Sequence, residues 1–175
     1  MGRIVIVNDK MQKGYSYEIT KRPGNIDVRM KEALSPKEML KRGVFSGKMI
    51  QDCRDEFPKS WFAQAKLAGI GNAPDHKLNE FKVKSRQSLK KWQNKGWIYG
   101  NDVRGWFQWY CRYYQGRRDP NVDELQINRW LAFKRHTGAL IKASKKECRK
   151  GDPTLQPKRR QALLQWAYDP YIDLK

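Results

Sequence analysis

The residues best suited to chemistry lie in the segment 84–118, which reads KSRQSLKKWQNKGWIYGNDVRGWFQWYCRYYQGRR. Its second half predicts a helix over 103–115, on which Arg and Gln side chains recur at intervals of four and form one polar stripe. Arg and Gln match the hydrogen-bonding edges of guanine and adenine, and Arg also binds phosphates. The sequence therefore predicts a nucleic-acid contact made of this stripe and the two arginines after it: Arg104, Gln108, Arg112, Arg117 and Arg118.

The same helix carries a second surface made of large aromatic side chains. Trp106, Trp109, Tyr110 and Tyr113 follow the spacing of one helix face. Aromatic residues at this spacing usually pack into a core, and we favour this interpretation for most of them. The alternative for one or two of them is stacking on exposed bases, as in proteins that bind single strands or flip bases out of a duplex.

A group of carboxylates supplies the main candidate for catalysis. Asp52, Asp55 and Glu56 stand at i, i+3 and i+4, so a helix over 47–57 would bring them to one face, as a Mg²⁺-dependent nuclease requires. The alternative is a solvated patch paired with neighbouring cations. Magnesium enters only with the nuclease hypothesis, and the sequence predicts no other cofactor.

Isolated acidic residues suggest a second kind of enzyme. Asp102 is the one acidic residue between Lys82 and Arg118, and Asp119 and Asp123 follow soon after. A base-excision glycosylase places such a carboxylate beside a base that has been flipped out of the duplex. Each of the three also fits an ordinary position at the start of a helix. The sequence thus leaves open whether the protein is an enzyme.

The three cysteines and two histidines do not form a recognisable metal-binding motif. No pair of them has the short spacing that is typical of zinc ligands. An odd number of widely spaced cysteines also argues against a disulfide framework and indicates a reducing, intracellular compartment, nuclear or cytoplasmic. The sequence therefore predicts free thiols and no metal site.

Positive charge is the most unusual property of the chain. Its 175 residues carry 37 Lys and Arg against 18 Asp and Glu, which gives a net charge of +19. Two windows hold most of this excess: 82–118 has ten basic residues and one acidic, and 129–160 has eleven and two. Such a charge usually persists because the partner is a polyanion. Further cations that we expect to neutralise phosphates are Lys90, Lys91, Lys134, Arg135, Arg159 and Arg160.

Nucleic acid suits this charge better than a membrane surface. Aromatic residues are spread through both basic windows, and no stretch approaches the roughly 20 apolar residues of a membrane-spanning helix. DNA is favoured over RNA because the chain lacks disordered arginine-glycine tracts. We therefore predict a DNA-binding protein, with a DNA-processing enzyme and a structural subunit of a ribonucleoprotein or virion as the alternatives.

A mainly helical fold must position these residues. The short β-branched run 3–7 and the alternating residues of 14–20 predict a small N-terminal β hairpin. Gly, Pro and capping residues divide the rest into helices, predicted over 35–43, 47–57, 59–68, 85–96, 102–115, 120–142 and 157–169. The prediction is a mainly α protein, a compact bundle of about six to seven helices with the hairpin packed on it. Residues 1–34 would form the β-containing segment and 35–175 the helical basic body of one integral domain.

The run GWFQWYCRYYQGRR at 105–118 resembles a known signature. It is similar to a family of small basic proteins that share the motif GWFQWYCRYYxGRR and have no assigned function. The segments 43–48, 52–58 and 160–167 resemble further parts of the same family. The resemblance implies one integral domain over most of the chain and implies nothing about mechanism.

Overall fold

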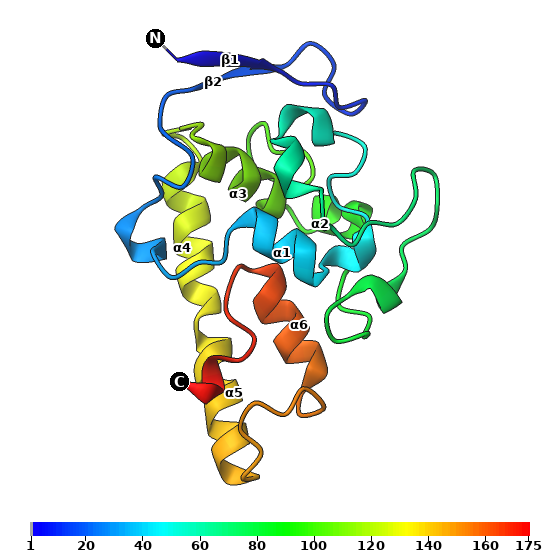
Figure 1. The fold of residues 1–175 in the computed structure, drawn as a ribbon. Helices are drawn as coiled ribbons and strands as arrows, with labels where there is room; N and C mark the ends of the chain where they lie inside the picture. The colour runs from blue at the N-terminus through cyan, green and yellow to red at the C-terminus, as the bar shows by residue number, and fades with distance from the viewer. Residues whose placement is uncertain (1) are drawn as a thin grey trace.

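The computed structural model describes residues 2–175 and begins with a β hairpin. Strand β1 (Arg3–Ile6) pairs antiparallel with β2 (Ser16–Ile19), and Val5 lies opposite Tyr17. Val5, Val7 and Tyr17 are buried together, and Tyr15 and Ile19 pack against them, as the alternation of 14–20 predicts for that strand. The hairpin lies at one end of the molecule (Figure 1).

The hairpin is attached to the helical body at the end of helix α3 (Trp106–Gln115). Ile19 forms an isolated β-bridge with Arg117, and the backbone amide of Lys21 donates to the carbonyl oxygen of Gly116 at 3.1 Å. Gly116 has a left-handed φ of 116° and ends α3. The N-terminal segment is therefore built directly onto the body.

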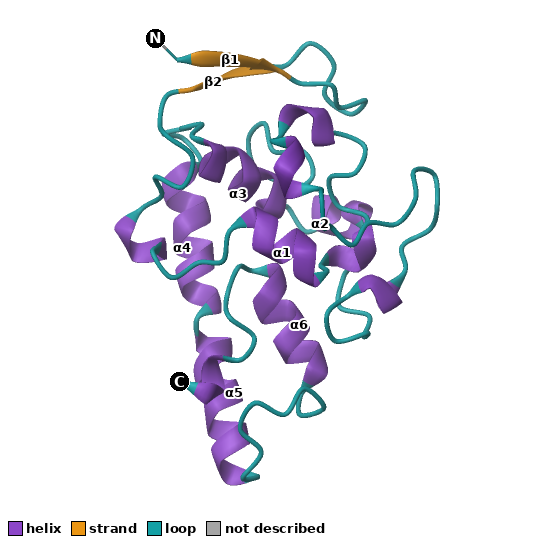
Figure 2. Ribbon diagram, in the orientation of Figure 1, coloured by secondary structure: helices purple, strands orange, loops and turns teal. Residues whose placement is uncertain are grey.

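Helices form most of the remaining regular structure (Figure 2). The α-helices within residues 2–175 are α1 (Pro36–Arg42), α2 (Leu89–Asn94), α3 (Trp106–Gln115), α4 (Asp123–Phe133), α5 (Arg135–Lys146) and α6 (Pro157–Gln165). α4 and α5 follow one another along one side of the molecule, and α6 packs against α5 (Figure 1). None of the helices described has the length and apolar character needed to cross a membrane. The prediction of a mainly helical protein with a small β hairpin is confirmed.

Two of the predicted helices are wrong. In place of helices over 47–57 and 59–68, the chain forms single 3-10 turns at Arg54–Glu56 and Lys59–Trp61. Within 47–68 the only glycine and proline are Gly47 and Pro58, which leave two stretches of ten residues. A helix this short depends on tertiary packing, and here the backbone amides of Lys66 and Ala68 donate to the carbonyl oxygens of Leu40 and Gly47 instead of within a helix.

Four further helices have different boundaries from those predicted. The helix predicted over 102–115 begins at Trp106, and the helix predicted over 157–169 ends at Gln165. The helix predicted over 120–142 is divided at Lys134, whose carbonyl oxygen accepts hydrogen bonds from the amide and hydroxyl of Thr137 at 2.9 and 2.7 Å. Such a back-bonding hydroxyl bends a helix. The helix predicted from position 85 begins only at Leu89, because the hydroxyl of Ser88 caps it.

Helix α3 forms the centre of the core. Trp109 and Tyr110 are fully buried, and the ring of Trp106 stacks on that of Tyr110 with centroids 5.0 Å apart. Trp109 stacks in the same way on Tyr113 at 4.8 Å. The aromatic face of this helix therefore packs into the core, which was the favoured interpretation of its spacing.

Candidate functional site

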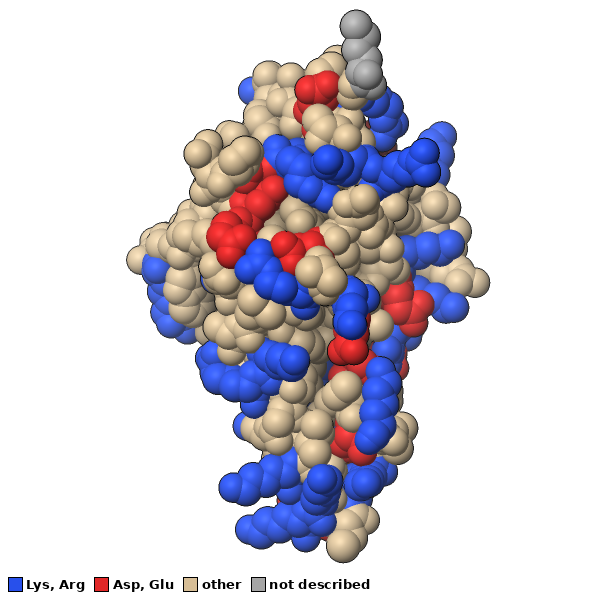
Figure 3. Space-filling model, turned by 90° about the vertical axis from the view of Figure 1, so that its left-hand side faces the viewer, with Lys and Arg blue, Asp and Glu red and all other residues tan. Residues whose placement is uncertain are grey.

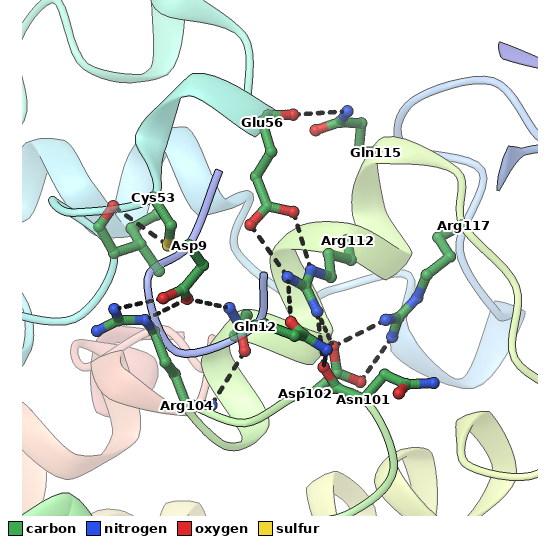
Figure 4. Close-up of polar contacts among 12 residues, drawn as sticks. Asp9, Gln12, Cys53, Glu56, Asn101, Asp102, Arg104, Arg112, Gln115 and Arg117 are labelled. Carbon is green, nitrogen blue, oxygen red and sulfur yellow. Dashed lines mark hydrogen bonds and ion pairs between the residues drawn. The ribbon is translucent and has the colours of Figure 1, made fainter. Parts of the chain in front are cut away.

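The polar stripe of α3 lies inside the protein. Arg112 is fully buried, and its Nε and Nη2 donate to the carboxylate of Glu56 at 3.0 and 3.1 Å. Its Nη1 donates to Asp102 at 3.2 Å, and Arg117 donates to both oxygens of Asp102 at 2.8 and 2.7 Å. Figure 4 shows the two carboxylates approaching Arg112 from two sides. Burial disfavours charge on both guanidinium groups, but the carboxylates outweigh it and raise the pKa of Arg112 and of Arg117.

Arg104, Gln108 and Arg118 also contact the protein, through the hairpin turn and through α3 itself. Arg104 donates from Nε and Nη2 to Asp9 at 2.6 and 2.9 Å (Figure 4). Gln108 donates to the same carboxylate at 3.3 Å. Arg118 is half-buried, donates to the carbonyl oxygen of Tyr113 at 2.9 Å and lies over its ring. These side chains join the N-terminal segment to α3 and leave little of the stripe at the surface.

Arg160, which was expected to neutralise a phosphate, is also fully buried. Its guanidinium donates to both oxygens of Asp173 at 2.9 and 2.8 Å and to the carbonyl oxygen of Pro170 at 2.6 Å. The expectation that Arg112, Arg117 and Arg160 face a partner is therefore corrected. Each of them is paired with a buried carboxylate, and such a pair is costly to break.

The carboxylates predicted for catalysis do not share a face. Glu56 and Asp102 are buried in the ion pairs of Arg112, whereas Asp52 and Asp55 are exposed. In residues 2–175, no group of three His, Cys, Asp or Glu side chains is placed to hold a metal ion. The nuclease hypothesis thus loses the helical geometry from which it was argued.

Several of the predicted phosphate contacts do lie on the surface. These exposed residues are Lys90, Lys91, Lys134 and Arg135. Arg159 is half-buried and donates to Gln156. On the face drawn in Figure 3, cations extend along the molecule with carboxylates between them, and they do not gather into a single patch.

A cavity of about 440 Å³ opens where α2, α3, α4 and α6 meet. Its walls are largely aromatic, and they include Trp92, Trp97, Trp106, Phe133 and Trp166. Its charged lining residues, in the part of the chain that the structure describes, are all cations: Lys84, Arg86, Arg129 and Lys158. The first two belong to the basic window 82–118 and the last two to 129–160, so the fold brings both windows to this cavity.

Arg86 lines the cavity and, unlike the arginines of the buried ion pairs, has no carboxylate partner among the described residues. Its side chain is half-buried, and among the described residues its Nη1 has no hydrogen-bond partner. Burial lowers the pKa of Arg86. A buried donor left unsatisfied costs about 1–3 kcal/mol, and a charged one costs more. Because Nη1 is closed to solvent, a ligand in the cavity would meet the rest of this guanidinium, which makes no ion pair with the residues described.

Arg129 is held by neutral groups. Its Nη1 donates to Gln126 at 2.8 Å, and its guanidinium carbon lies 5.0 Å from the ring centroid of Tyr99 and 5.5 Å from that of Trp166. Burial lowers the pKa of Arg129 as well. The cavity thus has a second arginine whose charge is not balanced by a carboxylate among the contacts described within residues 2–175.

The arrangement suits a ligand that is both planar and anionic. The aromatic walls offer flat apolar surfaces, and the arginines offer paired donors that match the oxygens of a phosphate. Sequence reasoning missed Arg86, Arg129, Trp92 and Trp97, although Arg86 and both tryptophans lie in the same basic run. Comparison of the chain with models of protein families, with curated proteins and with solved structures gave no match.

Proposed function

We propose that this protein binds nucleic acid, DNA in preference to RNA, and that Arg86 and Arg129 contact its phosphates. The observation that carries the proposal is an aromatic cavity whose charged lining, among the described residues, is entirely cationic. A phosphate in the cavity would balance the charge of Arg86, which no carboxylate among the described residues pairs. The preference for DNA comes from composition alone.

The charge of the whole chain supports the same partner. A net charge of +19 attracts polyanions from a distance and speeds their encounter with the protein. Lys84 and Lys158 are exposed at the cavity, and Lys90 and Lys91 are exposed on α2, which forms one of its walls. In this proposal these lysines neutralise phosphates on either side of the two arginines. The contact surface is therefore the mouth of the cavity and not the stripe of α3.

Charge-neutral variants of the two arginines test the proposal. We expect Arg86→Gln and Arg129→Gln each to weaken the binding of labelled single-stranded DNA by about tenfold or more, because each removes a charge-assisted hydrogen bond. Arg22→Gln is the matched control, since Arg22 is exposed and does not line the cavity. It should change the affinity by about twofold or less. Fluorescence anisotropy at one fixed salt concentration measures all three, with RNA of the same sequence as a second probe.

Thermal unfolding separates a lost contact from a lost fold. Arg86→Gln removes no protein partner from Nη1 within the described residues, so its melting temperature should not fall below that of the wild type. Equal effects of Arg86→Gln and Arg22→Gln on affinity would contradict the proposed site. Failure of the wild-type protein to bind any oligonucleotide at moderate salt would contradict the proposed function itself.

A further inference from the structure

Arg86 lies at the junction of three hollows in the surface. It lines the aromatic cavity, a second hollow of about 140 Å³ that also includes Asp52, and a third of about 410 Å³ that includes Pro74 and His76. The aromatic cavity and the third hollow also share Lys84 and Gln87. Arg86 is therefore the lining residue that all three hollows have in common.

Trp97 offers the most accessible ring in the cavity wall. It is 38% exposed, whereas the other aromatic lining residues are half-buried or buried. The Nζ of Lys95 lies 4.6 Å from its ring centroid. A single exposed tryptophan needs no explanation on an ordinary surface. This one, however, borders a cavity that also contains an arginine without a carboxylate partner among the described residues.

We propose that the aromatic cavity holds one unstacked nucleotide of a nucleic-acid strand, with its base against Trp97 and Trp92 and the adjoining phosphate on Arg86. The inference rests on the proposed function and deepens it, because it names the part of the nucleic acid that is recognised. Nucleic acid is the occupant that the charge favours: flat bases match the aromatic walls, and a phosphate on each side of the base matches the cations at the mouth.

The cavity accepts a base only from a strand that can release one. Its volume of about 440 Å³ lies in the range of sites for single small molecules. A paired base inside a duplex reaches such a site only after it has been unstacked and unpaired, which costs free energy. The protein should therefore prefer single strands, or duplexes with an unpaired nucleotide.

A probe without bases measures how much the bases contribute to the binding affinity. The full-length protein is titrated with a labelled oligothymidylate and with an abasic phosphodiester strand of the same length and charge. Stacking of one base contributes roughly fivefold to a hundredfold to affinity. We expect the wild-type protein to bind the intact strand at least about fivefold more tightly than the abasic strand, whereas thymidine monophosphate should compete only weakly.

Variants at the cavity and beside it complete the test. Trp97→Ala should abolish the preference for the intact strand, and Trp97→Phe should retain it because a phenyl ring still stacks on a base. Trp97→Leu, which fills space without an aromatic face, replaces the alanine variant if that one does not fold. Lys91→Gln is the matched control, because Lys91 is exposed on α2 and does not line the cavity. It should weaken the binding of both strands equally.

The outcomes distinguish this inference from the proposed function. Equal affinity of the wild type for intact and abasic strands, or a preference that survives in both Trp97→Ala and Trp97→Leu, overturns the inference and leaves nucleic-acid binding in place. Thymidine monophosphate that binds as tightly as the strand also overturns it, because the site would then serve a free nucleotide. If neither strand binds, both proposals fail.

Discussion

At the scale of residues, arginine has two roles in this protein, which depend on whether a carboxylate lies within reach. Arg112 and Arg160 are fully buried beside charged partners, whereas the half-buried Arg86 has no carboxylate partner among the described residues. Removing one partner of a buried pair leaves an uncompensated charge in the interior, which is strongly destabilising. The paired arginines therefore stabilise the fold, and the arginines of the cavity can bind a ligand.

Asp173→Asn tests the structural role of Arg160. Hydrogen bonds from Arg160 lower the pKa of Asp173 in the folded protein, below the value of about 3.9 that an unfolded chain has. The stabilisation by this carboxylate is then fully present above the unfolded pKa and is lost as the pH falls through the lower folded pKa. We expect the variant to lose about 3–5 kcal/mol in free energy of unfolding at pH 7, and to lose less below about pH 4.

Urea denaturation at several pH values measures this difference. Asp55→Asn is the control, because Asp55 is exposed and accepts one long hydrogen bond, 3.4 Å from Asn8. Its free energy of unfolding should change by about 0.5 kcal/mol or less. A loss of the same size in both variants, or a loss in Asp173→Asn that does not depend on pH, would contradict the role assigned to the buried pair.

At the scale of elements, the sequence predicts the positions of helices better than it predicts which of their faces are buried. The periodicity of α3 correctly separates an aromatic face from a polar one, yet both faces are buried. The polar face is buried because Asp9 and Glu56 reach it from distant segments of the chain. No residue near α3 in the sequence indicates these partners. The sequence of the polar stripe is therefore compatible both with buried ion pairs and with exposure to solvent.

The aromatic cavity could be predicted only in part. The two charged windows contain all four of its lining cations, and this charge is visible in the sequence. The helices α2, α3, α4 and α6, however, converge through contacts that no periodicity encodes. A distant segment also contributes: the 3-10 turn at Phe45–Gly47, with its left-handed Ser46, brings Phe45 to the lining.

The joint between the hairpin and α3 depends on Gly116. Its φ of 116° lies in the left-handed region that favours glycine, and an added Cβ would collide with the carbonyl oxygen of Lys21. Gly71 also has a left-handed φ, of 82°, but no atom lies within 4 Å of its Cβ position in the structure described. We expect Gly116→Ala to lose roughly 2–4 kcal/mol in free energy of unfolding, and Gly71→Ala about 1 kcal/mol. Equal losses in urea denaturation would show that this joint does not anchor the hairpin.

At the scale of the whole molecule, the excess charge is spread well beyond the cavity. Figure 3 shows cations along the whole face, including the narrow end of the molecule where α5 ends, and Lys142, Lys145 and Lys146 are exposed on that helix. A field of this size attracts any polyanion. A measured affinity therefore does not locate the binding site, and the dependence of affinity on salt is the better measurement.

The dependence of affinity on salt concentration distinguishes a strand that is bound in the cavity from one that is held by surface charges elsewhere. Each phosphate neutralised on a single strand adds about 0.7 to the slope of log K against log salt concentration. Arg86→Gln combined with Arg129→Gln should therefore lower the slope by about 1.4. Neutralising Lys142, Lys145 and Lys146 removes more charge but should lower it by less than about half as much, since only cations that meet phosphates displace counterions. A slope that follows the number of charges removed, wherever they lie, would place the strand outside the cavity.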